Sequence, residues 1–352
     1  LQRRATMPAD QPLHPLLRTP TLRREGERDR RISEAEPMTA NPFRVDALDV
    51  ATGHPIEVLP GVYEVRESLA PAFDTPECWV SLFILTDPTG HARPAIIDTG
   101  VPRSTDTVIL PALAALGYAP SDLEVAVCSH SHHDHAGSNV QLRDATGCAI
   151  WIGRRDGPAL LRGDRFGDDV IPPHEADRLL DGGETITLAG RTYEVVDLPG
   201  HSPGSIGLYD RERHVFFTGD ALQARGTTTQ GVPGAADRPS YRRSIAATRA
   251  LTIEHLFPAH PYLPFPSSHV TPATEVTRYL DTCLDAIDSI DPRILDALRH
   301  DGGSATIDAI ARHVCAEFAA VPVLAAPILG GYLAQLAEAG HVRRDGDHWV
   351  VA

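Results

Sequence analysis

Four histidines and an aspartate lie within six consecutive residues of this chain, directly after a short apolar run. They are His130, His132, His133, Asp134 and His135. Imidazole nitrogen and carboxylate oxygen suit zinc, and so many imidazoles together are foreign to a packed core or an ordinary turn. The segment therefore indicates a metal site, and an open coordination position would make such a site catalytic rather than structural.

The spacing within this segment divides the residues between two metals. His130 and His132 are two positions apart, so in an extended backbone their side chains lean the same way and can bind one ion. Asp134 and His135 are neighbours; where a strand gives way to a helix, neighbours point apart and can serve a second ion nearby. A solvated histidine-rich loop that binds metal only adventitiously is the alternative.

Three further residues could complete the site, each next to a predicted strand. His201 lies in a turn that prolines and glycines fix, and Asp220 comes just past an apolar strand, where a carboxylate can bridge two metals. His260 follows another strand, whereas His255 lies inside that strand and His269 lies farther into the next loop. Read alone, His201 also fits an exposed turn, and Asp220 fits a turn or a helix N-cap.

Other polar residues could support the site or the substrate. Asp98 ends a predicted strand and could hold the metal loop in place, with a turn cap as the alternative. Four arginines occupy the polar segment 153–175, which we expect to form a lid. They are Arg154, Arg155, Arg162 and Arg165. Arginine binds carboxylates and phosphates, so Arg154, Arg155 and Arg165 are candidate substrate contacts, although a charged run more often forms a solvated loop.

The composition limits the classes of function. The chain has 352 residues, enough for one large domain and a small one, and its net charge of −15 argues against nucleic acid as a partner. All 32 basic residues are arginine, which excludes Schiff-base chemistry on lysine, including attachment of pyridoxal phosphate. Five scattered cysteines, no membrane-length apolar run and no visible signal peptide predict a cytoplasmic protein with reduced thiols.

Apolar patterns place these residues on a predicted framework. Residues 1–40 are predicted to be a disordered tail in which Met38 could be the true start, residues 41–300 a catalytic domain and residues 301–352 a small module. Strands are expected at 56–59, 62–66, 79–86, 95–98, 125–128, 149–152, 185–188, 192–197, 205–209, 214–218 and 253–257, and helices at 105–116, 240–250 and 272–290. Two successive strand-rich halves with intervening helices favour an α/β fold, the four-layer αβ/βα sandwich.

The module at the carboxyl end has a pattern of its own. Helices are expected at 306–318 and 327–339, followed by a hairpin of 341–344 and 348–351. Helix, helix and hairpin resemble a winged helix, which can bind nucleic acid. Its wing offers only Arg343 and Arg344, beside Asp345 and Asp347. Packing or dimerisation is the alternative role, so a homodimer is one expectation.

Taken together and in this order, the motifs resemble the five motifs of the metallo-β-lactamase superfamily over residues 55–270. The resemblance implies the sandwich fold and two bound zinc ions, with iron or manganese as alternatives. It assigns His130, His132 and His201 to the first metal, Asp134, His135 and His260 to the second, and Asp220 to the bridge between them.

The bridging aspartate also separates branches of that family. Asp220 resembles the bridge of the glyoxalase II and ribonuclease branches, which true β-lactamases lack. Lactonases of this fold carry a tyrosine shortly after the aspartate, whereas 221–223 is Ala-Leu-Gln here. Pro261 also departs from the glycine that usually follows the last histidine, which leaves the loop shape near the second metal open.

The resemblance predicts a hydrolase in which a hydroxide shared by two metals attacks the substrate. Asp134 would be the catalytic residue that steers the hydroxide or relays a proton, and no nucleophilic serine or cysteine is needed. We expect a small-molecule substrate, an acyl thioester or another ester-type bond. An endoribonuclease-like phosphodiesterase, a lactonase and a catalytically silent metal-binding scaffold are the alternatives.

Overall fold

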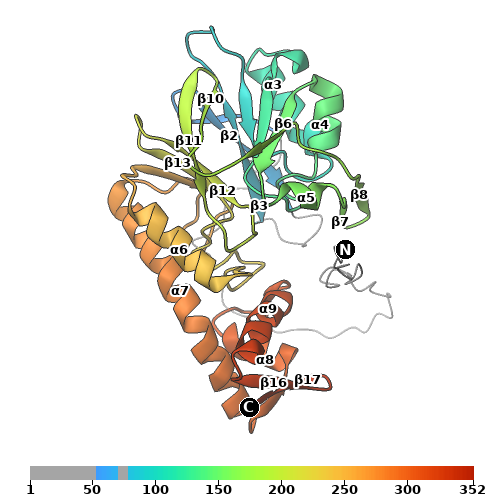
Figure 1. The fold of residues 1–352 in the computed structure, drawn as a ribbon, viewed down its shortest axis with the longest axis vertical. Coiled ribbons are helices and arrows are strands. Elements are labelled where there is room, and N and C mark those ends of the chain that lie inside the picture. Colours follow the sequence, from blue (N-terminus) through green and yellow to red (C-terminus); the bar gives the residue numbers. More distant parts are fainter. Residues whose placement is uncertain (1–52, 70–77) are drawn as a thin grey trace, which may run out of the picture. The chain divides into compact units, whose positions relative to one another are not determined.

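Two β-sheets lie face to face with helices on both outer sides in the computed structural model (Figure 1). The structure describes residues 53–69 and 78–352. The tail predicted for residues 1–40 lies outside the described residues. The arrangement confirms the predicted four-layer αβ/βα sandwich.

The first sheet has seven strands in the order β1-β2-β3-β4-β5-β6-β9. Its strands are β1 (Ile56–Leu59), β2 (Val62–Ser68), β3 (Trp79–Leu85), β4 (Ala95–Ile97), β5 (Val125–Cys128), β6 (Ala149–Gly153) and β9 (Arg178–Leu180). β1 to β4 pair antiparallel, and β4, β5, β6 and β9 are parallel. Every residue of β5 is buried, because helices cover one face of the sheet and the second sheet covers the other.

The second sheet has five strands in the order of the sequence. They are β10 (Thr185–Leu188), β11 (Arg191–Asp197), β12 (Ile206–Asp210), β13 (Val215–Gly219) and β14 (His255–Pro258). Only the last pair, β13 and β14, is parallel. The strand predicted for 253–257 begins at His255, so His255 opens the strand instead of lying within it.

Aromatic rings from both sheets meet between them. The ring of Phe83 in β3 lies 5.1 Å from that of Phe217 in β13 and 5.2 Å from that of Phe257 in β14. Each of the three side chains is at most 2% exposed. Truncating one buried phenylalanine to alanine costs about 3–5 kcal/mol, because transfer energy is lost and a cavity remains. This shared core holds the sheets together and so fixes the strand ends that carry the candidate site.

Helices cover the outer faces of the two sheets. The first face is covered by a π-helix (Thr105–Ile109), α3 (Leu110–Ala115) and α4 (Asn139–Thr146), and the second by α6 (Arg238–Arg249) and α7 (Ala273–His300). The helix predicted for 272–290 continues to His300 through Pro292. Proline removes one backbone hydrogen bond, but the buried face of α7 continues at Ile294 and Leu298, and this packing keeps the helix intact.

The polar segment 153–175 contains more regular structure than its composition suggests. It forms α5 (Gly157–Leu160) and a hairpin of β7 (Asp164–Phe166) and β8 (Asp169–Ile171). Phe166 and Ile171 are buried, whereas the other four strand residues are exposed. A three-residue strand with one buried side chain is too short to give an alternating pattern, which is why the hairpin was not predicted.

The module at the carboxyl end has a three-stranded sheet and two helices. Its elements are β15 (Ser304–Thr306), α8 (Ile307–Val314), α9 (Ala325–Glu338), β16 (Val342–Asp345) and β17 (His348–Val351), with β17 in the middle of the sheet. β15 was not predicted, and the helix expected at 306–318 ends at Val314. Ile294 of α7 packs in one core with Ile310 of α8 and Leu333 of α9, so the boundary predicted at 300 stays a prediction.

Two further expectations concern the described residues. All five cysteines are free and buried. Within residues 53–69 and 78–352, the helices are all too short or too polar to cross a membrane.

Candidate metal centre

Strand ends place four of the predicted residues at one edge of the sandwich. Asp98 directly follows β4, and His130 comes two residues after its parallel neighbour β5. In the second sheet, Asp220 directly follows β13, and His260 comes two residues after its parallel neighbour β14. Parallel neighbours end at the same edge of a sheet, so these side chains meet where both sheets present their carboxyl ends.

A tight turn brings His201 to the same edge. The turn joins β11 to β12, and Gly200 within it has φ +138°. A Cβ atom on Gly200 would lie 2.5 Å from the backbone of Tyr241, so only glycine allows the turn to approach α6 this closely. The ring of His201 thereby lies 4.6 Å from that of His132 and 4.9 Å from that of His130.

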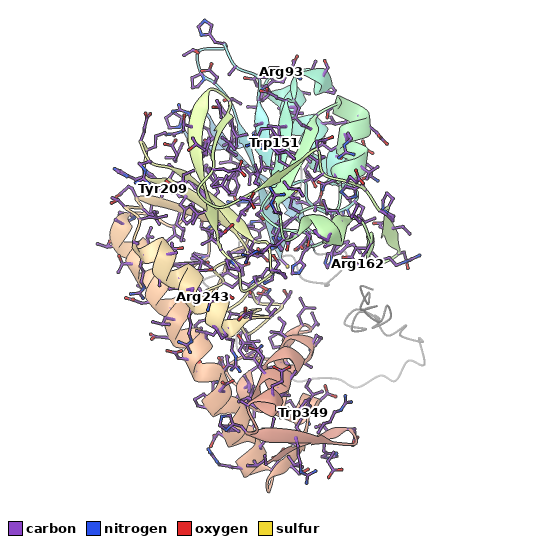
Figure 2. The ribbon with its side chains drawn as sticks, in the orientation of Figure 1. Arg93, Trp151, Arg162, Tyr209, Arg243 and Trp349 are labelled. Atoms are coloured by element: carbon purple, nitrogen blue, oxygen red, sulfur yellow. The ribbon has the colours of Figure 1, made fainter. Side chains whose placement is uncertain are left out.

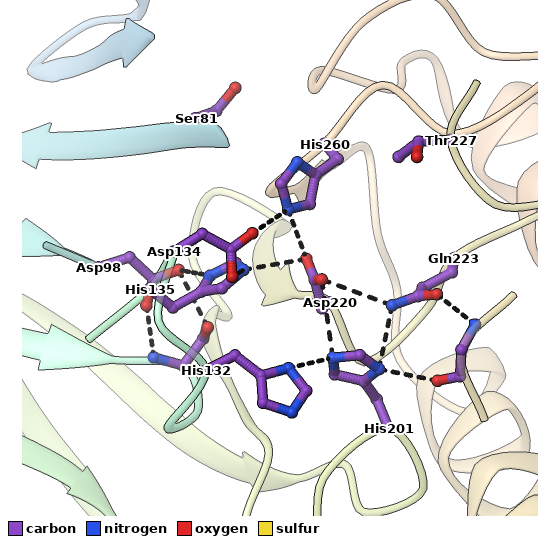
Figure 3. Close-up of polar contacts among 12 residues, drawn as sticks. Ser81, Asp98, His132, Asp134, His135, His201, Asp220, Gln223, Thr227 and His260 are labelled. Atoms are coloured by element: carbon purple, nitrogen blue, oxygen red, sulfur yellow. Dashed lines mark hydrogen bonds and ion pairs between the residues drawn. The ribbon is translucent and has the colours of Figure 1, made fainter. Parts of the chain in front are cut away.

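The structure brings all seven predicted ligands into one cluster. Figure 3 shows six of them, His132, Asp134, His135, His201, Asp220 and His260. Three overlapping groups have their ligand atoms within 4.8 Å of one another: His130, His132 and His201; His130, His135 and Asp220; and Asp134, His135 and His260. Asp220 lies between the others. Its Oδ1 is 3.4 Å from Nε2 of both His135 and His260, and its Oδ2 is 3.7 Å from Nε2 of His201.

Buried polar atoms without hydrogen bonds indicate which kind of ligand the cluster could bind. Nε2 of His130, Nε2 of His135 and Oδ1 of Asp220 are buried and have no hydrogen-bond partner among the described residues. Nε2 of His135 and Oδ1 of Asp220 face each other as an ion pair at 3.4 Å. Nε2 of His130 has neither kind of partner among the described residues, which costs about 1–3 kcal/mol without a ligand. Imidazole and carboxylate donors around a common centre fit a metal cation such as zinc.

Electrostatics in the cluster favour positive charge. Burial lowers the pKa of His130 well below its usual value and that of His132 to about 3, so both rings are neutral and keep a lone pair for a cation. Burial alone would lower the pKa of His135, but the carboxylates of Asp220, Asp134 and Asp98 raise it well above its usual value. A negative potential of this kind would bind a divalent cation.

Asp98 lies behind the cluster and orients one predicted ligand, His135. Its Oδ2 accepts a hydrogen bond from Nδ1 of His135 at 2.9 Å, and its Oδ1 accepts one from the Ser129 backbone N–H at 2.6 Å. With the proton on Nδ1, the lone pair of His135 is on Nε2 and faces the cluster. Asp98 has φ +62°, a conformation that aspartate tolerates better than most residues.

Backbone carbonyls orient two other histidines, and sequence reasoning missed both. The Gly234 carbonyl accepts a hydrogen bond from Nδ1 of His201 at 2.7 Å, and the Trp79 carbonyl accepts one from Nδ1 of His260 at 2.6 Å. Gln223 was missed too: its Oε1 accepts the Gly234 N–H at 2.6 Å, and its amide nitrogen lies 3.4 Å from Oδ2 of Asp220. Every residue has a carbonyl, so no sequence signal marks these partners.

Asp156, which the sequence patterns did not single out, ties two ligand segments together. Its carboxylate accepts hydrogen bonds from the backbone N–H of Ser131 at 2.9 Å and of Gly204 at 2.7 Å. It also accepts one from the Ser202 hydroxyl at 2.8 Å, and the residue is 2% exposed. One buried carboxylate thus fixes the loop of His130 and His132 relative to the turn of His201.

The remaining candidates lie outside the cluster. Arg154 is exposed and pairs with Asp181 at 2.6 Å, and Arg155 and Arg165 are exposed as well. Arg162 of the same segment is exposed too, and Figure 2 shows it at the edge of the molecule. Contact of Arg154, Arg155 or Arg165 with a substrate stays a prediction.

Three histidines without a place in the cluster have other partners. His255 and His269, the alternatives to His260, lie 2.9 Å apart from Nδ1 to Nε2 and form a pair of their own. His133 turns away from the ligands: its Nδ1 is 3.7 Å from Asp164, and its ring is 4.9 Å from that of Phe166. It therefore contacts the β7–β8 hairpin.

Comparison with known proteins identifies the family. The sequence model of the metallo-beta-lactamase superfamily matches residues 80–260, more than half of the chain. The chain belongs to this superfamily. In keeping with this, a metallo-beta-lactamase family protein from Thermus thermophilus has the same fold, with a TM-score of 0.60 over 84% of this chain and 100% of that chain at 19% identity.

Curated relatives within the superfamily are hydrolases by name. Hydroxyacylglutathione hydrolase GloC of Haemophilus influenzae is 35% identical over 134 residues, which are 36% of this chain and 61% of the relative. Acyl-coenzyme A thioesterase MBLAC2 of Gallus gallus is 30% identical over 158 residues, 38% of this chain and 55% of the relative. The chain spans less than two thirds of the length of either relative.

Proposed function

We propose that this chain is a metal-dependent hydrolase of acyl thioesters whose seven clustered ligands bind two zinc ions. The position of Asp220 carries the proposal, because its two oxygens face ligands of both predicted metal sets, at 3.4 Å from His135 and His260 and 3.7 Å from His201. The names of two relatives, a hydroxyacylglutathione hydrolase and an acyl-coenzyme A thioesterase, support the thioester as the bond that is cleaved.

The proposal divides the ligands as the resemblance implied. His130, His132 and His201 would hold one ion, Asp134, His135 and His260 the other, and Asp220 would contact both. Metal ions in such a site polarise a substrate carbonyl and make water a stronger nucleophile at neutral pH. The protein's own part is to orient its imidazoles, through Asp98 and the carbonyls of Gly234 and Trp79.

Asp134 is the proposed proton carrier. Its side chain is 17% exposed, against 6% for Asp220, so it is the more accessible of the two carboxylates in the cluster. Its Oδ2 lies 3.4 Å from Nε2 of His260 and its Oδ1 lies 3.7 Å from Nε2 of His135, so both oxygens face the cluster, and the carboxylate is assigned to accept a proton from an attacking water. The carboxylate then releases that proton to solvent or to the departing thiolate.

A single accessible carboxylate suits a thioester better than an amide or a phosphodiester. A thiol has a pKa of about 8.5, so it departs as the thiolate without prior protonation, whereas an amine or an alkoxide needs a proton as it leaves. The wing of the carboxyl-terminal module gives no support to a nuclease: Arg343 pairs with Asp345 at 3.3 Å, and Nε of Arg344 donates to the Gly346 carbonyl.

A substrate panel tests the proposal. The purified full chain is loaded with zinc and assayed on a hydroxyacyl-glutathione, an acyl-coenzyme A, a lactone, a β-lactam and a labelled RNA. We expect the highest kcat/KM on the thioesters, its loss with a chelator and its return with zinc. Asp220→Asn should lower that value by more than about 100-fold, because a ligand shared by both sets is weakened.

Asp281→Asn is the matched control. Asp281 lies on the exposed face of α7 and pairs with Arg249, so the same substitution there should leave kcat/KM unchanged. Thioester turnover that survives complete removal of metal would contradict the proposal. Cleavage of the RNA without turnover of either thioester would replace it with the phosphodiesterase alternative.

A further inference from the structure

The loop of residues 223–238 joins the metal cluster to the carboxyl-terminal module. On the cluster side, the Gly234 carbonyl accepts the hydrogen bond of His201 Nδ1 at 2.7 Å. Oε1 of Gln223 accepts a hydrogen bond from the Gly234 N–H at 2.6 Å. The amide nitrogen of Gln223 lies 3.4 Å from Oδ2 of Asp220 and 3.1 Å from Nδ1 of His201. The position of Gly234 therefore determines how the imidazole of His201 faces the other ligands.

On its other side, the same loop rests against the module. The hydroxyl of Tyr332 in α9 donates to the Pro233 carbonyl at 2.8 Å, and Tyr332 is 1% exposed. The backbone N–H of Leu324 donates to the Thr229 carbonyl at 2.9 Å. A Cβ atom on Gly231 would lie 2.7 Å from Pro322, so the module and the loop are in close contact.

Two adjacent carbonyls thus have different partners. Pro233 is held by Tyr332, 99 residues further along the chain, and Gly234 is bonded to His201, 33 residues back. Both bonds are buried or partly buried, so water does not readily replace the lost partner. Displacing the Pro233 carbonyl would rotate the peptide that joins it to Gly234 and shift the acceptor of His201.

We infer that the carboxyl-terminal module sets the orientation of His201, with Tyr332 as the positioning residue. This inference rests on the proposed function, because it treats His201 as a ligand of the first metal. Partners that orient a metal-bound histidine typically change metal affinity by about 10–100-fold. Tyr332 contacts Pro233, the residue before the direct partner of His201. We therefore expect loss of its hydroxyl to lower the metal affinity of the position that His201 would hold by about three- to tenfold.

The variant Tyr332→Phe tests this inference, and Tyr209→Phe is its matched control. The Tyr209 hydroxyl donates to the Thr252 carbonyl at 2.6 Å, and Figure 2 shows this residue on the five-stranded sheet. Both variants lose one hydroxyl bonded to a backbone carbonyl, so their metal-free forms should lose similar amounts of thermal stability. Zinc titration of each metal-free protein against a chromogenic chelator gives the affinity of each bound ion.

We expect Tyr332→Phe to weaken one zinc equivalent by about three- to tenfold and to leave the other unchanged, while Tyr209→Phe changes neither. Nitrogen NMR of the metal-free proteins supplies a second measurement that needs no metal. The ring of His201 should carry its proton on Nδ1 in the wild type and in Tyr209→Phe, and should populate both tautomers in Tyr332→Phe.

The two outcomes separate the inference from the proposed function. A wild-type protein that binds no zinc contradicts the proposed function, and the tautomer measurement still decides whether Tyr332 orients His201. Unchanged tautomers in Tyr332→Phe, together with zinc affinities equal to those of Tyr209→Phe, would overturn the inference.

Discussion

Nδ1 of His135 lies 2.9 Å from Oδ2 of Asp98, so a residue at the end of β4 orients a predicted ligand that comes 37 positions later. The same carboxylate accepts the Ser129 N–H and so fixes the start of the ligand loop. Because Asp98 directly follows β4, which pairs with β5 inside the first sheet, the orientation of His135 is tied to the rigid core and not to a flexible loop.

Asp98→Asn should weaken metal binding without unfolding the chain. Asparagine tolerates the positive φ of Asp98 nearly as well as aspartate does, so the backbone is retained. The amide presents an N–H toward Nδ1 of His135 and favours the other tautomer, which turns an N–H toward the cluster. We expect zinc affinity to fall by about 10–100-fold in competition titrations. An affinity within about twofold of the wild type would show that this hydrogen bond is not needed.

His133→Gln should keep the metal and loosen the β7–β8 hairpin. His133 contacts Asp164 and Phe166 of β7. It is not a member of the three groups of described residues that could hold a metal ion. We expect the wild-type zinc content by atomic absorption, together with faster amide exchange in residues 164–171. His132→Gln, one position earlier, is the contrast and should lose zinc. Loss of zinc from both variants would mean that His133 has a part in binding.

Acid should destabilise the chain through His269. Burial, followed by the charge of His255, lowers the pKa of His269 to about 4. Between about pH 6.5, the pKa of an unfolded histidine, and this folded value, the unfolded chain binds a proton that the native chain does not. The free energy of unfolding therefore decreases as the pH is lowered through this window. The decrease is about 1 kcal/mol after allowing for solvent screening of a partly exposed ring.

Urea denaturation at pH 7 and pH 5 measures this effect in the metal-free protein. His269→Gln removes the titrating group and should show a smaller loss of unfolding free energy between the two pH values. His300→Gln, at an exposed position on α7, should follow the wild-type curve. A pH dependence that is the same in all three proteins would exclude His269 as the cause.

Arg154 and Arg155, two of the predicted substrate contacts, should affect KM differently when each is replaced by alanine. Arg154 is paired with Asp181 at 2.6 Å, whereas the described residues offer Arg155 no salt bridge of its own. An unpaired guanidinium is free to bind a substrate carboxylate, so Arg155→Ala should raise KM for a hydroxyacyl-glutathione several-fold without lowering kcat. Arg154→Ala should change KM less. Equal KM values in both variants and the wild type would contradict the substrate-contact prediction for Arg154 and Arg155.

The amino-acid sequence by itself determined the local part of the site. The two-residue spacing of His130 and His132 and the adjacency of Asp134 and His135 are chemical facts of the chain, and strand patterns predicted which residues follow strand ends. The same patterns predicted the two strand-rich halves and therefore the sandwich. Such signals are readable because side-chain direction repeats with the period of the element.

Only the tertiary structure decided what holds these ligands in place. The partners of His201 and His260 are the carbonyls of Gly234 and Trp79, which lie 33 and 181 residues away in the chain. Carbonyls carry no sequence signature, and contacts across such separations depend on how the sheets pack. The same holds for Tyr332, whose role depends on the docking of the carboxyl-terminal module against one loop. Sequence specifies which atoms can bind a metal, and packing specifies where their lone pairs point.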